Sequence, residues 1–80
     1  MVNHPQMDVR KLVGRNFVRL RHEKGLTQEQ VEERSGLSQQ YISGLENGHR
    51  NPSVVTLYHL ATALDVSLVE LVQPATKRKR

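Results

Sequence analysis

Apolar residues recur at helical spacing along most of the chain, and no segment alternates apolar and polar residues as a β-strand does. A first helix is predicted from Asp8, a capping residue, to about Lys24, because Gly25 provides the left-handed position that ends a helix. Its apolar positions form one stripe that we expect to be buried: Val9, Leu12, Val13, Phe17 and Leu20. Gly14 costs this helix about 1 kcal/mol relative to alanine, so it either serves close packing or is merely tolerated.

Two short helices are predicted next, each opened by a capping residue. Thr27 begins a Thr-x-x-Gln capping box, which indicates a helix that ends near Ser35. Ser38 is expected to cap a third helix over residues 39–47, and Gly48 ends it.

Two more helices complete the pattern. Either Asn51 or Ser53 can cap a fourth helix, whose expected core positions are Leu57, Leu60, Ala61 and Leu64. A second capping box begins at Ser67 and opens a fifth helix that runs to about Val72, since Pro74 prevents its continuation. The sequence therefore predicts an all-α fold of five helices.

These helices predict one domain over residues 8–72, between a disordered lead at residues 1–7 and a flexible basic tail at residues 73–80. Eighty residues lie near the lower limit for an unaided hydrophobic core. The chain contains no cysteine, so helix packing must supply the stability that disulfides or thiolate-bound metals give other small domains.

The net charge of +4 is weak evidence for nucleic-acid binding. Residues 77–80 supply four of the twelve basic side chains, so the rest of the chain carries as many acidic as basic groups. The run at 77–80 is compatible with phosphate attraction, with a solubilising end or with a nuclear-localisation signal, and we favour phosphate attraction.

Several classes of protein are disfavoured. No apolar run approaches the roughly 20 residues of a membrane span, and the first residues lack a signal-peptide core, so we expect a cytoplasmic protein without membrane contact. The chain offers little interior for a substrate pocket and no catalytic constellation, which disfavours an enzyme. The four histidines lack metal-ligand spacing, so we expect no metal and no cofactor.

The most informative stretch is residues 28–47, where two short helices meet at Gly36. Such helices can cross steeply if the turn glycine adopts a positive φ and the contact residues are apolar. The candidate contact residues are Val31, Leu37, Ile42 and Leu45. With Ile42 and Leu45 inward, helical geometry leaves Gln39, Gln40, Ser43 and Gly44 on or near the outer face.

The segments GRNFVRLRHEKGLTQEQVEERSG, LSQQYISGLENG and NPSVVTLYHLATALDVSLVEL, within about residues 12–72, resemble the XRE family of Cro- and repressor-type helix-turn-helix proteins. The resemblance implies a compact five-helix λ-repressor-like bundle that binds double-stranded DNA in transcription control. Small phage repressors and restriction–modification controller proteins are the most similar members. Glu32 and Ser35 depart from the family's pattern of small and apolar residues, and Glu32 fits the helix–helix seam only if it tilts outward or pairs with Arg34.

The resemblance implies that helix 39–47 enters the major groove and that Gln39 and Gln40, at its first turn, contact bases. A glutamine amide can donate and accept hydrogen bonds at adenine, although two glutamines also suit a solvated helix start. Ser43 is a third candidate, for a base or a phosphate. The helix contains no Arg or Lys, so we expect half-sites in which A·T pairs and DNA shape dominate.

Seven residues near this helix are expected to contact the DNA backbone: Gln28, Ser38, Tyr41, Asn47, His49, Arg50 and Asn51. Gln28 stands at a helix N-terminus, where amides and dipole attract a phosphate oxygen, and it can also simply cap that helix. Arg50 is the strongest of these candidates because it carries the only full charge nearby.

Two structural roles follow from the same resemblance. Arg21 and Glu46 look like the family's internal ion pair, which we expect to be exposed, worth at most about 1 kcal/mol and important for orientation. The apolar residues Val55, Tyr58, Val69 and Val72 fall outside the predicted core stripes and are expected to form a homodimer interface. They could instead complete a slightly larger monomeric core.

The sequence thus predicts a homodimeric transcription regulator, of repressor type, that reads a palindromic operator in double-stranded DNA and takes no small-molecule ligand. The alternative is an antitoxin or regulatory partner whose helix-turn-helix domain binds another protein.

Overall fold

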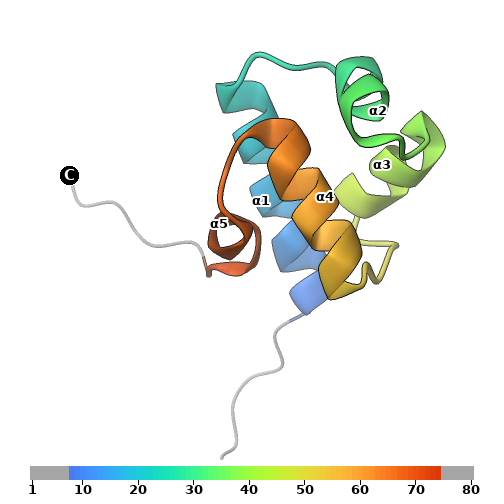
Figure 1. Cartoon of the computed structure of the whole chain (residues 1–80). Helices are drawn as coiled ribbons and strands as arrows, with labels where there is room; N and C mark the ends of the chain where they lie inside the picture. Colours follow the sequence, from blue (N-terminus) through green and yellow to red (C-terminus); the bar gives the residue numbers. More distant parts are fainter. Residues whose placement is uncertain (1–7, 75–80) are drawn as a thin grey trace, which may run out of the picture.

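The computed structural model describes residues 8–74, which form five α-helices and no strand (Figure 1). The helices are α1 (Val9–Glu23), α2 (Gln28–Ser35), α3 (Gln39–Glu46), α4 (Val54–Leu64) and α5 (Leu68–Val72). All five predicted helices are therefore present, and the ends that the sequence analysis specified lie within about one residue of those observed. The predicted lead at residues 1–7 and most of the basic tail lie outside the described residues.

The helix ends follow local capping chemistry. The Asp8 carboxylate accepts hydrogen bonds from the backbone N–H groups of Arg10 (3.2 Å) and Lys11 (3.4 Å), and Thr27 forms the expected capping box. Ser53, rather than Asn51, caps α4, with its hydroxyl accepting from the backbone N–H of Thr56 at 3.1 Å.

The core is aliphatic around one phenylalanine. Its most deeply buried side chains come from all five helices: Phe17, Leu20, Val31, Ile42, Leu45, Leu60, Leu64 and Leu71. One member of the predicted stripe is wrong, because Val9 is 56% exposed. It occupies the first position of α1, one turn before Leu12 and Val13 enter the core.

Helix α1 packs against α3 and α5, α2 packs against α3 and α4, and α4 packs against α5. Helix α3 therefore contacts both α1 and α2, and it lies at the right-hand side of the molecule in Figure 1. Gly14 permits the close approach of α1 to α3: a Cβ atom there would lie 2.5 Å from the Leu45 carbonyl oxygen and 2.9 Å from that of Glu46. Close packing, rather than tolerance, explains this glycine.

Among the described residues, Asn16 is the polar side chain that is most completely buried, at 2% exposure. Its amide nitrogen donates hydrogen bonds to the carbonyl oxygens of Leu71 and Gln73, each at 2.9 Å. These carbonyls belong to the C-terminal end of α5, where helix carbonyls lack partners of their own. Asn16 thereby fixes the end of α5 against the middle of α1.

None of the helices in residues 8–74 is long and apolar enough to cross a membrane.

We expect Gly14→Ala to lower the free energy of unfolding by about 1–3 kcal/mol, because the added methyl group meets two backbone carbonyls that cannot rotate away. This destabilisation should occur although alanine favours the helix intrinsically. Urea denaturation followed by circular dichroism measures it. Arg15→Ala, at the exposed neighbouring position, is the control and should change stability by less than about 0.5 kcal/mol; equal stabilities of the two variants would contradict the close-packing role.

Candidate nucleic-acid interface

Helices α2 and α3 form a helix-turn-helix unit around Gly36. This glycine has φ = +81°, as the turn requires, and Leu37 in the turn packs against the core. Ile42 and Leu45 are 0% and 1% exposed, so α3 is anchored from its inner face. The opposite face and the first turn of α3 remain open to solvent, and Gln39 and Gln40 are both exposed there.

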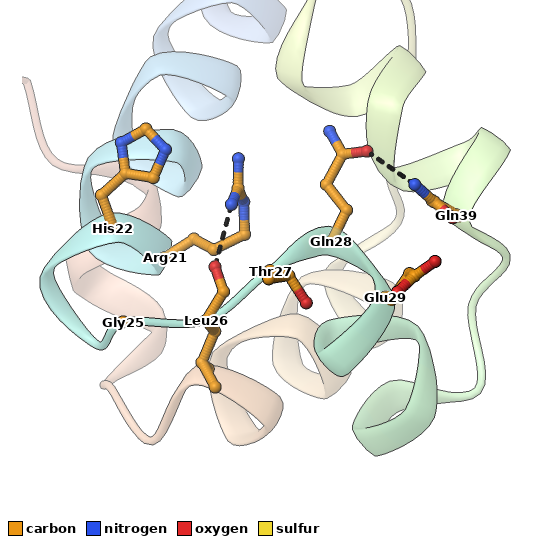
Figure 2. A pocket seen from close by; sticks show the side chains of 8 residues that line it. All are labelled: Arg21, His22, Gly25, Leu26, Thr27, Gln28, Glu29 and Gln39. Carbon is orange, nitrogen blue, oxygen red and sulfur yellow. Dashed lines mark hydrogen bonds between the residues drawn. The ribbon is translucent and has the colours of Figure 1, made fainter.

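A chain of hydrogen bonds links Gln39, through Gln28, to Glu46 at the end of α3, and Figure 2 shows the bond between Gln39 and Gln28. The Gln39 amide nitrogen donates to the Gln28 amide oxygen at 3.4 Å. The Gln28 amide nitrogen in turn donates to a Glu46 carboxylate oxygen at 2.9 Å. The side chain of Gln28 is therefore engaged with α3 rather than with the end of its own helix, and it orients Gln39.

The network ends at an ion pair between Arg21 and Glu46, as the sequence predicted. Arg21 Nε and one carboxylate oxygen are 2.6 Å apart, Arg21 Nη2 donates to the other oxygen at 3.1 Å, and Nη1 donates to the Leu26 carbonyl oxygen at 2.9 Å. The expectation of an exposed pair was wrong, because the two side chains are only 11% and 10% exposed. The pair is buried where the end of α1 meets the end of α3.

A surface hollow of about 490 Å³ lies beside this network. Its walls come from the end of α1, the loop between α1 and α2, the start of α2 and the first residue of α3. The lining residues are Arg21, His22, Gly25, Leu26, Thr27, Gln28, Glu29 and Gln39 (Figure 2). The described residues contain no group of three or more His, Asp or Glu side chains that could hold a metal ion.

The C-terminal end of α3 reverses the chain through a Schellman motif. Gly48, at φ = +76°, donates its N–H to the Leu45 carbonyl oxygen at 3.0 Å, and the N–H of His49 donates to that of Gly44 at 2.9 Å. The reversal brings Arg50 back along α3, where its guanidinium carbon lies 5.1 Å from the centre of the Tyr41 ring.

The other predicted backbone contacts surround the same helix. The Ser38 hydroxyl accepts from the backbone N–H of Tyr41 at 3.0 Å, and the Asn47 amide donates to the Ser43 carbonyl oxygen at 2.9 Å, so both side chains cap α3. His49 and Asn51 are exposed in the loop after α3. The predicted contact residues thus lie on α3, in the loops at its two ends and, for Gln28, at the start of α2.

Glu32 and Ser35, which depart from the family's sequence pattern, do not disrupt the packing of α2 against α3. Glu32 is exposed and lies outside the seam between α2 and α3, and no ion pair joins it to Arg34 within residues 8–74. Arg34 instead donates to the Ala63 carbonyl oxygen at 3.1 Å, which ties the end of α2 to α4. The Ser35 hydroxyl accepts from the backbone N–H of Leu37 and so contributes to the turn.

Four apolar side chains on α4 and α5 are exposed to solvent. Val55 and Tyr58 on α4 are 62% and 60% exposed, and Val69 and Val72 on α5 are 61% and 39% exposed. These four residues do not complete the core of the single chain, so that alternative is wrong. Val54, which is 69% exposed beside Val55, was not anticipated.

The chain matches the family model HTH_3, a helix-turn-helix, over residues 18–71. It is 74% identical over 68 residues to a protein of Sinorhizobium fredii named as an uncharacterized HTH-type transcriptional regulator, y4dJ, with 85% of this chain and 88% of that protein covered.

Two solved structures are similar. The restriction-modification controller protein C.AhdI from Aeromonas hydrophila has a TM-score of 0.74 and 44% identity, over 78% of this chain and 94% of that one. The controller protein C.Esp1396I, solved as a tetramer in complex with its natural 35 base-pair operator, has a TM-score of 0.73 and 30% identity, over 84% and 97%.

We expect Glu46→Ala to lower the free energy of unfolding by about 3 kcal/mol, because it leaves the Arg21 guanidinium buried without its counter-ion. The matched control is Glu23→Ala, which breaks the Arg19–Glu23 pair of α1, whose side chains are 50% and 59% exposed. That change should cost less than about 0.5 kcal/mol. Urea midpoints of the two variants decide the matter, and similar small decreases in both would show that burial of the Arg21 pair adds nothing.

Proposed function

We propose, from the premise that the chain belongs to the HTH_3 helix-turn-helix family, that it is a transcription regulator that binds double-stranded DNA sequence-specifically through α3. Membership of this family confirms the XRE resemblance read from the sequence. The DNA-bound C.Esp1396I structure supports the proposed ligand, since a chain of the same fold is solved there on its operator.

The observation that carries the proposal is the contrast between the two faces of α3. Ile42 and Leu45 are 0% and 1% exposed, whereas Gln39 and Gln40 are exposed at the first turn. A short helix that is anchored by its inner face and carries amide side chains at its N-terminal turn suits insertion into the major groove, where glutamine can form hydrogen bonds with adenine. We assign the base contacts to Gln39, Gln40 and Ser43.

The hydrogen bond from Gln39 to Gln28 supports this assignment. A side chain already held by a neighbour loses less conformational freedom when it binds a base. Gln28 is itself held by the buried Glu46, so the network transmits the rigidity of the core to the reading end of α3.

Groups around α3 are assigned to the DNA backbone. Gln28 lies at the N-terminus of α2 beside the 490 Å³ hollow, and backbone N–H groups at such a terminus attract phosphate oxygens. On the other flank we assign phosphate contacts to Tyr41, Arg50 and Asn51. Ser38, Asn47 and His49 complete the set of backbone contacts, and the first two also cap α3.

We further propose a homodimer joined through Val55, Tyr58, Val69 and Val72, whose exposure leaves an apolar surface on α4 and α5. Two-fold symmetry would present two α3 helices about 34 Å apart, one turn of DNA, to a palindromic operator. We assign the regulator a repressor role without catalytic activity or a small-molecule ligand, acting in the cytoplasm, where a bacterial-type operator lies.

Selection of bound duplexes from a random pool is the direct test. We expect palindromic half-sites in which A·T pairs dominate, because α3 carries no arginine or lysine for guanine. Gln39→Ala and Gln40→Ala should each cost about 1–3 kcal/mol of binding to the selected duplex and relax one base position each. Gln73→Ala, at an exposed glutamine beyond α5, is the control and should bind as the unaltered protein does.

Two outcomes of that selection would contradict the proposal. Half-sites dominated by G·C pairs would refute the assigned mode of base reading. Absence of any enriched duplex, together with co-purification of a second protein, would favour the alternative of a regulatory partner protein.

The dimer is tested by sedimentation. Tyr58→Asp places a charge in the apolar surface and should convert a dimer to a monomer at micromolar concentration, since an unpaired charge is costly to bury. Tyr58→Phe keeps the ring and should remain dimeric. A monomeric unaltered protein at high micromolar concentration, with footprints of a single half-site, would disprove the dimer.

A further inference from the structure

The base-reading helix lacks a cation of its own, and Arg50 supplies one from outside it. Helix α3 contains no Arg or Lys, and the buried Glu46 is its only charged residue. Arg50 follows the Schellman reversal at Gly48 and lies back against α3. Its position is therefore set by its packing on the surface of α3 rather than by its own loop alone.

Two residues of α3 form a seat for the Arg50 side chain. Tyr41 presents its ring, with the guanidinium carbon 5.1 Å from the centroid, and Gly44 lies one turn further along the same face. A Cβ atom on Gly44 would lie 2.7 Å from Arg50 Nε and 3.4 Å from Arg50 Cγ and Cζ. The absence of a side chain at Gly44 is thus what lets the guanidinium lie on the helix.

Among residues 8–74, the Arg50 side chain has no further hydrogen-bond or ion-pair partner. Its Nε is buried and donates to no acceptor within residues 8–74, and no described carboxylate forms an ion pair with it. A cation–π contact of the guanidinium with the Tyr41 ring uses none of its terminal N–H groups, which remain for an external acceptor. The phosphate oxygen is an acceptor that an arginine fork fits.

Gly44 differs in this respect from Gly14. At Gly14 the obstacle to a methyl group is the backbone of α3, whereas at Gly44 it is the side chain of Arg50. A methyl group on Gly44 can be accommodated if Arg50 swings away, and alanine favours the helix. The substitution should therefore displace the arginine while the protein stays folded.

We propose that Gly44 and Tyr41 are positioning residues that hold Arg50 in a preset orientation for a DNA phosphate at the edge of α3. This inference rests on the proposed function, because it needs α3 to bind DNA. It adds to that function a role for Gly44, which touches no ligand. It also explains how a helix without a cation can present one at its edge.

A double-mutant cycle tests the seat, with affinity measured for the duplex obtained by selection. Gly44→Ala should weaken binding on the order of tenfold, as Arg50→Ala does, since each removes one charge-assisted hydrogen bond per protomer. In the Arg50→Ala background, Gly44→Ala should change affinity less than about twofold. A second tenfold weakening in that background would show that Gly44 acts through α3 itself and would overturn the proposal.

The salt dependence separates positioning from general damage to α3. Gly44→Ala and Arg50→Ala should each make the slope of log K against log salt less negative by about 0.9 for each phosphate that is no longer neutralised. Half-site preference should stay as in the unaltered protein, and the urea midpoint should not fall, since alanine at position 44 favours the helix. An unchanged slope and affinity in Gly44→Ala would also overturn the proposal.

The ring is tested in the same assay. Tyr41→Leu removes the stacking face and should reduce the slope as Arg50→Ala does, whereas Tyr41→Phe keeps the face and should retain the slope. If the slope of log K against log salt in Tyr41→Leu equals that of the unaltered protein, Tyr41 does not position Arg50. If the unaltered protein selects no duplex, the proposed function fails and this inference with it; if it binds and Gln39→Ala weakens binding but the cycle shows no coupling, only the seat is wrong.

Discussion

The position of α3 depends on the packing of α1 against the carboxyl end of α3, and the buried Arg21–Glu46 pair is the centre of that packing. Glu46 receives hydrogen bonds from α1 through Arg21 and from α2 through Gln28. Gly14 lets the two helices approach closely enough for the pair to form. Because the two side chains are only 11% and 10% exposed, breaking the pair would leave an uncompensated charge in the interior, which favours the orientation of α3 that keeps the pair intact.

The helices and their ends could be predicted from the sequence because they depend on neighbours along the chain. A hydroxyl at Ser38 or a glycine at Gly36 acts within one turn of its own position, so its effect is visible in the local pattern. Side-chain burial was predicted correctly along α4, where the four expected core residues are all buried. The predicted burial of Val9 was wrong because the apolar stripe alone does not show how far along α1 the neighbouring helices extend. Asn16 lies within the apolar stripe of α1, and this position was a usable signal for its buried hydrogen bonds.

The candidate interface was predictable in its outline and not in its connections. The exposure of Gln39 and Gln40 follows from the inward anchors on the same helix. The bridge made by Gln28, the burial of the Arg21–Glu46 pair and the seating of Arg50 on Gly44 join residues from different elements. Such connections depend on the crossing of helices in three dimensions, which the spacing of residues does not encode.

Helix α1 has a further consequence through Asn16, which holds the end of α5 as Arg21 holds the end of α3. The proposed dimer surface on α5 and the proposed DNA-binding helix α3 are therefore both attached to the same helix, α1. In a two-fold dimer, α1 would therefore help to set the distance between the two α3 helices. One additional base pair at the centre of an operator shifts a half-site by about 3.4 Å and rotates it by about a tenth of a turn. A dimer that holds its two α3 helices at a fixed distance would discriminate between operators by the spacing of their half-sites as well as by their base sequence.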